Sequence, residues 1–276
     1  MDPFKKELIG KLKKFPKDDN LLSMALVGSF AEKEKFGKSE DVDIAVVFKK
    51  MSVKSFLLLK NYLEAICKSL SNNERYVYPA IVSGPIKPKS GKRQTFMLHV
   101  LLAKYETYEI RWSRPLIVDW MYHNLPLRGK KIKELVKFRR FSKEDLLEGG
   151  DGLEFVKRII TSRKMISSVY FVRNGKIVKR RWKRAVKGKD EVFEILQYAI
   201  ISSLLNVARL HNPKFKKDEI SLVGYSQKNL PKRYSKMVSD IYGMKKEFKE
   251  TGKLDFDQKE WENKATDFIN HLIDSV

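Results

Sequence analysis

Apolar residues recur at three- and four-residue spacings along much of the chain, and this pattern predicts amphipathic helices. We expect helices over residues 3–15, 52–70, 153–172, 191–210, 231–249 and 258–275, the fourth being the most apolar. Pro16 would end the first helix, because proline cannot continue helical hydrogen bonding. The last four helices predict a mainly α-helical bundle in the C-terminal half.

Short apolar runs in the N-terminal half predict β-strands instead. The runs 24–27 and 44–48 flank a polar segment, which we expect to hold a loop or a short helix ending about Phe36-Gly37. The runs 76–82 and 95–103 are separated by a Gly/Pro/Lys segment, and we expect an antiparallel hairpin. The fold class is therefore α+β.

A domain boundary is expected after residue 128, where a basic run leads to a Gly-rich loop at 147–152. The predicted domains are residues 1–128 and 129–276. Within the second, Asn174-Gly175 indicates either a tight β-hairpin or a loop between helices.

The chain is strongly basic. The chain has 57 Lys and Arg against 34 Asp and Glu, a formal net charge of +23. Such an excess favours a polyanionic partner such as RNA, the alternative being a solvated Lys-rich surface. The single cysteine, Cys67, excludes an internal disulfide and falls in an apolar helical pattern, which predicts a core position. With neither a signal-peptide pattern nor a membrane-span pattern, we expect a cytoplasmic protein.

The candidate chemistry lies between the first two strands. Asp41 and Asp43 open the second strand, and alternation places both carboxylates on one side of it. Adjacent carboxylates repel unless a cation such as Mg²⁺ or Mn²⁺ lies between them. Gly28 allows close backbone approach, and Ser29 could cap a helix beginning about Phe30, which suits a phosphate.

These residues resemble the pattern of the nucleotidyltransferase superfamily typified by DNA polymerase beta and kanamycin nucleotidyltransferase. Gly28-Ser29 is followed by eleven residues and then by Asp41-Val42-Asp43-Ile44. The resemblance covers about residues 20–128. It implies a polymerase-beta-like small mixed sheet with flanking helices, an NTP substrate, Mg²⁺ or Mn²⁺ at the aspartates, and transfer of NMP to a hydroxyl. Members of this superfamily commonly have a basic residue after the Gly-Ser pair, for which Lys33 is the candidate here.

The chain departs from that superfamily at the strand 95–103, where active members usually carry a third carboxylate. His99 stands there instead. Three interpretations remain open: His99 is the catalytic base, Glu106 or Glu109 substitutes, or catalysis is weak or lost. The last would make the protein a binding module for RNA or a protein partner.

Other residues could serve partners. The densest basic segment surrounds an aromatic ring and predicts a nucleic-acid-binding surface, with a solvated loop as the alternative. Its residues are Lys179, Arg180, Arg181, Trp182, Lys183 and Arg184. Arg93, between the predicted hairpin strands, could also contact a phosphate backbone, with a solvated loop tip as the alternative. Asp119 and His123, four residues apart, could hold a metal or form a surface pair. The charge favours RNA as acceptor over an aminoglycoside, with protein as an alternative, and the 191–210 helix could support a homodimer.

Overall fold

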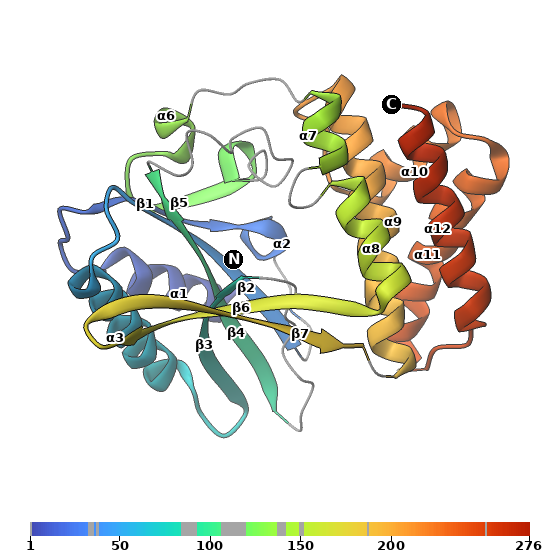
Figure 1. Ribbon diagram of the computed structural model, residues 1–276. Coiled ribbons are helices and arrows are strands. Elements are labelled where there is room, and N and C mark those ends of the chain that lie inside the picture. Colours follow the sequence, from blue (N-terminus) through green and yellow to red (C-terminus); the bar gives the residue numbers. More distant parts are fainter. Residues whose placement is uncertain are drawn as a thin grey trace. The chain divides into compact units, whose positions relative to one another are not determined.

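The computed structural model describes residues 2–32, 36, 39–83, 93–105, 120–136, 142–148, 152–186, 188–251 and 253–276. Contacts among them form two compact units (Figure 1). Unit 1 holds the described residues up to 136 together with 166–183, and unit 2 holds 142–165 and 184–276. Compared with the expected boundary after residue 128, unit 1 also contains 129–136 and most of a later hairpin.

Unit 1 is built on a mixed seven-stranded sheet in the order β5-β1-β2-β4-β3-β6-β7. β4 pairs in parallel with β2 and with β3, whereas the β1–β2, β1–β5 and β3–β6 pairs are antiparallel. The strands are β1 Leu21–Val27, β2 Ser39–Phe48, β3 Arg75–Ser83, β4 Gln94–Lys104, β5 Asn124–Gly129, β6 Lys164–Arg173 and β7 Lys176–Ala185. With the helices described below, this sheet confirms the α+β class.

The expected antiparallel hairpin of β3 and β4 is wrong, because the two strands run parallel. β4 lies between β2 and β3 and is covered on both faces, so that Phe96, Met97 and Leu98 are all fully buried. A continuous apolar run is typical of such an interior parallel strand. The Gly/Pro/Lys segment between the strands permits a turn but does not determine strand direction.

The predicted N-terminal helices are confirmed as α1 Pro3–Lys13 and α3 Val53–Leu70, with Ser52 capping α3. The short helix differs from expectation, since α2 spans Gly28–Glu32. Ser29 therefore lies inside its first turn and is not a cap. Phe36 is not helical, and its ring stacks on Phe30 with centroids 4.5 Å apart. Gly37 lies outside the described residues.

The two faces of the sheet bury different clusters. On one side, α1 and α3 pack against alternate strand residues including Val42, Ile44 and Leu98; we name it the α1/α3 face. On the other, Ala25 and Ala45 pack with Trp120 and the short helix α6 Ile132–Leu135; we name it the opposite face. Cys67, on α3, is buried in the first cluster as predicted.

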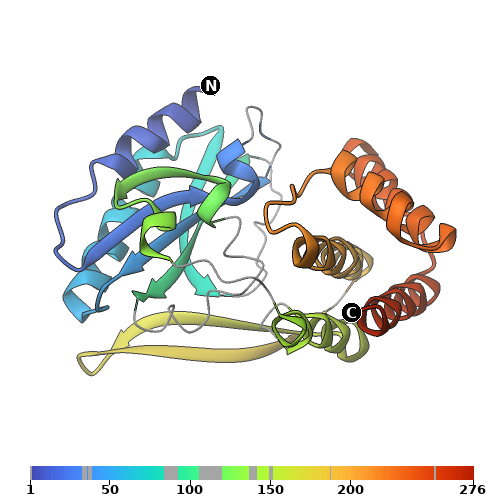
Figure 2. The same cartoon turned by 90° about the horizontal axis from the view of Figure 1, so that it is seen from above.

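Unit 2 is a helical bundle around one long helix, α9, which lies in its core. Figure 2 views this bundle after a turn of 90°. Its helices are α7 Lys143–Glu148, α8 Leu153–Ser162, α9 Lys189–His211, α10 Glu219–Asn229, α11 Lys232–Thr251 and α12 Gln258–Asp274. The helices predicted over 191–210, 231–249 and 258–275 are confirmed.

The helix predicted over 153–172 is wrong beyond Ser162. Arg163 adopts the left-handed conformation at φ 49° and ends α8, and β6 begins at Lys164. Met165 and Ile166 fit the helical spacing of the residues before them but belong to β6. Short apolar runs rich in β-branched and aromatic residues are ambiguous by periodicity alone.

α9 is the one helix of the described residues that is long and apolar enough to cross a membrane. However, 72% of its apolar window is buried inside the chain. It packs against α8, α10 and α12. This burial is that of a bundle core helix.

Candidate active site

Strand pairing brings Gly28, Asp43 and His99 together on the opposite face of the sheet. Val27, the last residue of β1, pairs with Asp43 on β2, and Asp43 pairs with His99 on β4. Gly28 and Asp43, which belong to the two halves of the sequence pattern, therefore lie close together. His99, at the position where a third carboxylate was expected, lies beside them on the next strand.

Gly28 is required by the close approach of Asp43. Its backbone has φ 70°, a conformation that side-chain-bearing residues rarely adopt. A Cβ atom at this position would lie 2.7 Å from Oδ2 of Asp43. The carboxylate therefore lies directly over the peptide backbone where β1 passes into α2.

His99 holds the other oxygen of the same carboxylate. Its Nδ1 lies 2.8 Å from Oδ1 of Asp43, and the imidazole side chain is only 9% exposed. An ionised carboxylate can only accept, so Nδ1 of His99 is the donor. Nε2 of His99 is buried and has no hydrogen-bond partner among the residues that the structure describes. A buried polar atom without a partner is costly, which indicates a site for a ligand group.

Asp41 completes the acidic pair. It lies two residues before Asp43, on the same side of β2, and pairs with Met97. No group of three or more His, Cys, Asp or Glu side chains suited to a metal occurs among the described residues. Two carboxylates still fit Mg²⁺, which is commonly bound by one or two carboxylates together with substrate phosphates and water.

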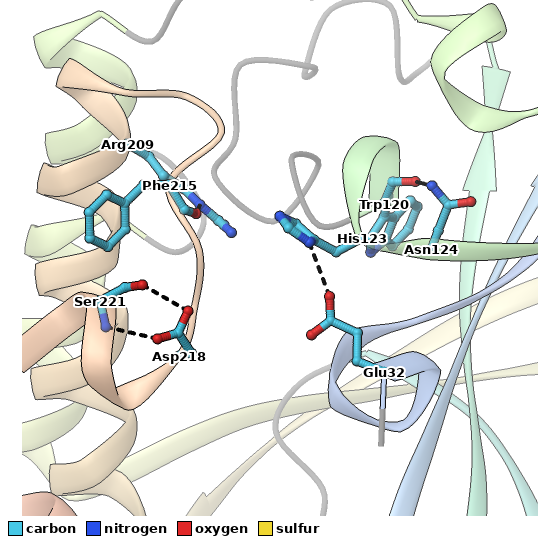
Figure 3. A network of polar contacts seen from close by, with 8 residues as sticks. All are labelled: Glu32, Trp120, His123, Asn124, Arg209, Phe215, Asp218 and Ser221. Carbon is cyan, nitrogen blue, oxygen red and sulfur yellow. Dashed lines mark hydrogen bonds and ion pairs between the residues drawn. The ribbon is translucent and has the colours of Figure 1, made fainter. Parts of the chain in front are cut away.

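The surroundings of α2 contain a pair that the sequence did not suggest. Ser29 is exposed at the start of α2. At its other end, Glu32 Oε1 lies 3.1 Å from Nδ1 of His123 (Figure 3). His123 thus pairs with a residue 91 positions away, a separation that no local spacing reveals.

Several predicted residues cannot be placed. Asp119, the predicted partner of His123, lies outside the described residues, as do Lys33, Glu106 and Glu109. Of the two described aromatic residues before β5, Trp120 is buried, and Tyr122 is 40% exposed. Nδ2 of Asn124 donates to the carbonyl of Trp120 at 2.7 Å (Figure 3), which anchors this segment to β5.

The basic segment forms β7, one strand of a hairpin with β6. Asn174 and Gly175 both have positive φ, 50° and 67°, as a type I′ two-residue turn requires. The hairpin alternative of the sequence is thus the correct one. Trp182 is 39% exposed and Arg180, Arg181 and Lys183 are also exposed.

Two of the predicted cations already have partners. Arg184 forms an ion pair with Glu191, and Nζ of Lys179 lies 5.2 Å from the ring centre of Tyr170. β7 is the outermost strand of the sheet. Lysine and arginine on an outer strand also protect it from pairing with other chains, so charge alone does not establish a nucleic-acid surface.

The polar contacts drawn for unit 2 are structural. Nε of buried Arg209 donates to the carbonyl of Phe215 at 3.2 Å (Figure 3). Asp218 caps α10 by accepting from the backbone N–H and hydroxyl of Ser221, both at 2.8 Å. The backbone hydrogen bond from Ser221 is the main cause of the lowered pKa of Asp218. These contacts hold the α9–α10 connection.

No protein-family model matches the chain, and no curated protein matches it either. The function must therefore be argued from the arrangement of Gly28, Asp41, Asp43 and His99.

Proposed function

We propose that unit 1 is the catalytic unit of a metal-dependent nucleotidyltransferase. The reaction would transfer a nucleoside monophosphate from an NTP to a hydroxyl acceptor and release pyrophosphate. The observation that carries the proposal is the position of Asp43, whose oxygens face the backbone of Gly28 on one side and His99 on the other. Asp41 lies on the same side of the strand.

Asp41 and Asp43 would hold Mg²⁺ or Mn²⁺. When bound, such an ion offsets negative charge on the attacking and leaving oxygens and orients the phosphates. Oδ1 of Asp43 is hydrogen-bonded to His99, whereas Oδ2 has no hydrogen bond within the described ranges and is available there as a metal ligand. The NTP phosphates would lie against Gly28 and Ser29, next to the metal ion held by Oδ2 of Asp43.

His99 would act as the general base. Its Nε2 would accept the proton of the acceptor hydroxyl as the hydroxyl oxygen bonds to the α-phosphorus and the bond to pyrophosphate breaks. Asp43 would orient the imidazole and stabilise the imidazolium that forms. This interpretation is supported by the unpartnered, buried Nε2 of His99.

A binding module for RNA or a protein partner is the second candidate. The observation that favours it is the presence of His99 on β4 beside Asp43, at the position of the expected third carboxylate. In this case RNA affinity would fall steeply with salt and would not change in Asp43→Asn.

The test is transfer of label from α-phosphate-labelled ATP, CTP, GTP or UTP to RNA and to protein, with Mg²⁺ or Mn²⁺. Asp43→Asn should lower transfer by more than about 100-fold, since loss of an outer-shell partner of a metal ligand alone costs about 10–100-fold. Asp19→Asn is the matched control, because its side chain is 91% exposed. Equal transfer by Asp43→Asn and the wild type would refute the proposal.

A further inference from the structure

A column of side chains on β3 lies beside the candidate active site. Tyr76, Tyr78 and Ala80 pair with Thr95, Met97 and His99 of β4. Val77 and Ile81, which belong to the alternate positions of the same strand, pack into the α1/α3 cluster. Alternation therefore places Tyr76, Tyr78 and Ala80 on the opposite face, with His99 and Asp43.

The two tyrosines form a stack that is covered at one end. Their ring centroids are 5.5 Å apart at an interplanar angle of 23°. The guanidinium carbon of Arg93 lies 5.2 Å from the centre of the Tyr76 ring. Because Gln94 pairs with Arg75, Arg93 lies on the side of Tyr76 away from Tyr78.

The other end of the stack faces Ala80. Tyr76 is the only ring in contact with Tyr78 within the part of the chain that the structure describes. Ala80 is the next residue of this column after Tyr78 and has a small side chain, and both residues are partly exposed. A further planar ring stacked on Tyr78 would lie over Ala80, directly beside His99.

Strand pairing fixes the distance between Ala80 and the proposed catalytic groups. Ala80, His99 and Asp43 lie in one row across three adjacent strands. Neighbouring strands are about 4.8 Å apart, so Ala80 and Asp43 are separated by about 10 Å, with His99 between them. A nucleoside whose base stacked on Tyr78 would therefore bring its sugar hydroxyl towards His99.

We propose that Tyr78 and Ala80 bind the terminal base of a polynucleotide acceptor. The inference rests on the proposed nucleotidyl transfer, since it names the acceptor of that site. The acceptor hydroxyl gives its proton to Nε2 of His99, its oxygen bonds to the α-phosphorus of the NTP, and pyrophosphate leaves. Donor and acceptor then lie on opposite sides of Asp43, the donor phosphates at Gly28 and the acceptor base at Tyr78.

Positive charge lies on the acceptor side. β6 and β7 follow β3 in the sheet, and Val82 pairs with Val169. Counting from the two-residue turn places Arg180 opposite Val169 on β7, and Trp182 two residues further on the same side. A polynucleotide entering over β7 would meet a cation and an exposed ring before its end reaches Tyr78. This favours a polynucleotide over a protein acceptor.

The test is fluorescence anisotropy of two 5′-labelled octaadenylate RNAs, one intact and one lacking its 3′-terminal base, without NTP. Wild type and Tyr78→Phe should bind the intact RNA about 5- to 100-fold more tightly, the range expected for one stacked base. Tyr78→Leu, which keeps an apolar side chain without the ring, should remove this preference. In turnover, it should raise the KM for the acceptor and leave the KM for the NTP unchanged.

Other results would overturn the inference. One is a preference for the intact RNA that persists in Tyr78→Leu, and another is no binding of either RNA. A third is weaker binding of a fluorescent ATP analogue by Tyr78→Leu, with RNA binding unchanged. The last result would assign the stack to the donor base. Failure of the proposed function is distinguishable, because the base preference would then be present without transfer of label.

Discussion

The two faces of β2 and β4 differ although their residues alternate along the same strands. On the α1/α3 face, Val42, Ile44 and Leu98 are fully buried among apolar side chains. On the opposite face, the neighbouring Asp43 and His99 form a polar pair. The comparison shows that the two faces of one strand can have different roles. Apolar packing on the α1/α3 face fixes the position of the backbone. The opposite face presents polar groups that can still bind a ligand.

The opposite face is itself divided along the strands. Ala25, Ala45 and Ala103 are small, and they pack under Trp120 and Ile132 in an apolar cluster. Towards the start of β2 the same face carries Asp41 and Asp43 in place of apolar residues. The two aspartates thus lie on a strand whose following residues are fixed by the apolar cluster.

The largest expected effect is on turnover by His99→Gln. Loss of a general base lowers kcat by about 10²–10⁴-fold. Glutamine can still donate to Asp43, so binding of Mn²⁺ and NTP should change little. The measurement is steady-state kinetics at saturating NTP and Mn²⁺. A kcat within about 10-fold of the wild type would remove His99 from the reaction.

Leu98→Ala tests the other face of the same strand. Because Leu98 is fully buried in the α1/α3 cluster, truncation should lower the free energy of unfolding by about 2–5 kcal/mol. Urea unfolding followed by circular dichroism measures this change. Molecules that remain folded should keep their kcat. A large fall in kcat without a loss of stability would show that the two faces are not separate in function.

Gly28→Ala should affect both stability and activity, with a loss of activity of about 10- to 100-fold. The new Cβ would meet Oδ2 of Asp43, and the positive φ adds backbone strain. Gly175→Ala is the matched control, because Gly175 has a similar φ of 67° and nothing within 4 Å of its Cβ position. Equal activity in the two variants would show that the contact with Asp43 is unimportant.

The smallest effect on turnover, none, is expected for Cys67 on the α1/α3 face. Burial raises the pKa of its thiol to about 12. The folded protein therefore keeps the thiol protonated where the unfolded chain ionises, and stability is lost as the pH rises from about 9 towards 12. At pH 8, reaction with Ellman's reagent should be at least about 100-fold slower in the native protein than in urea. Equal rates would show that this face opens readily.

Periodicity was sufficient for most elements but not for their pairing. The apolar spacing predicted α3, and the Asp41–Asp43 alternation predicted a shared side of β2. Strand direction was missed at β3, because a loop of Gly, Pro and Lys is compatible with either direction. The β6 strand was missed because its apolar residues also fit a helical period.

The site was predictable in its local part only. Gly28 and Asp43 belong to one short pattern, and His99 was suggested by its place in a strand. The stack of Tyr76 and Tyr78 was not predicted, although their two-residue spacing in a strand was visible, because its meaning depends on the pairing with β4. The contact between Glu32 and His123 depends on the fold alone.

The central claim is that the Asp41–Asp43–His99 face transfers a nucleotidyl group. The most direct measurement incubates the protein and RNA with an NTP labelled at either the α- or the γ-phosphate. The account predicts that α-label becomes attached to RNA while γ-label is released as pyrophosphate, and that both changes are lost in Asp43→Asn. Attachment of γ-label to the acceptor, or release of γ-label as inorganic phosphate without α-label transfer, would contradict it.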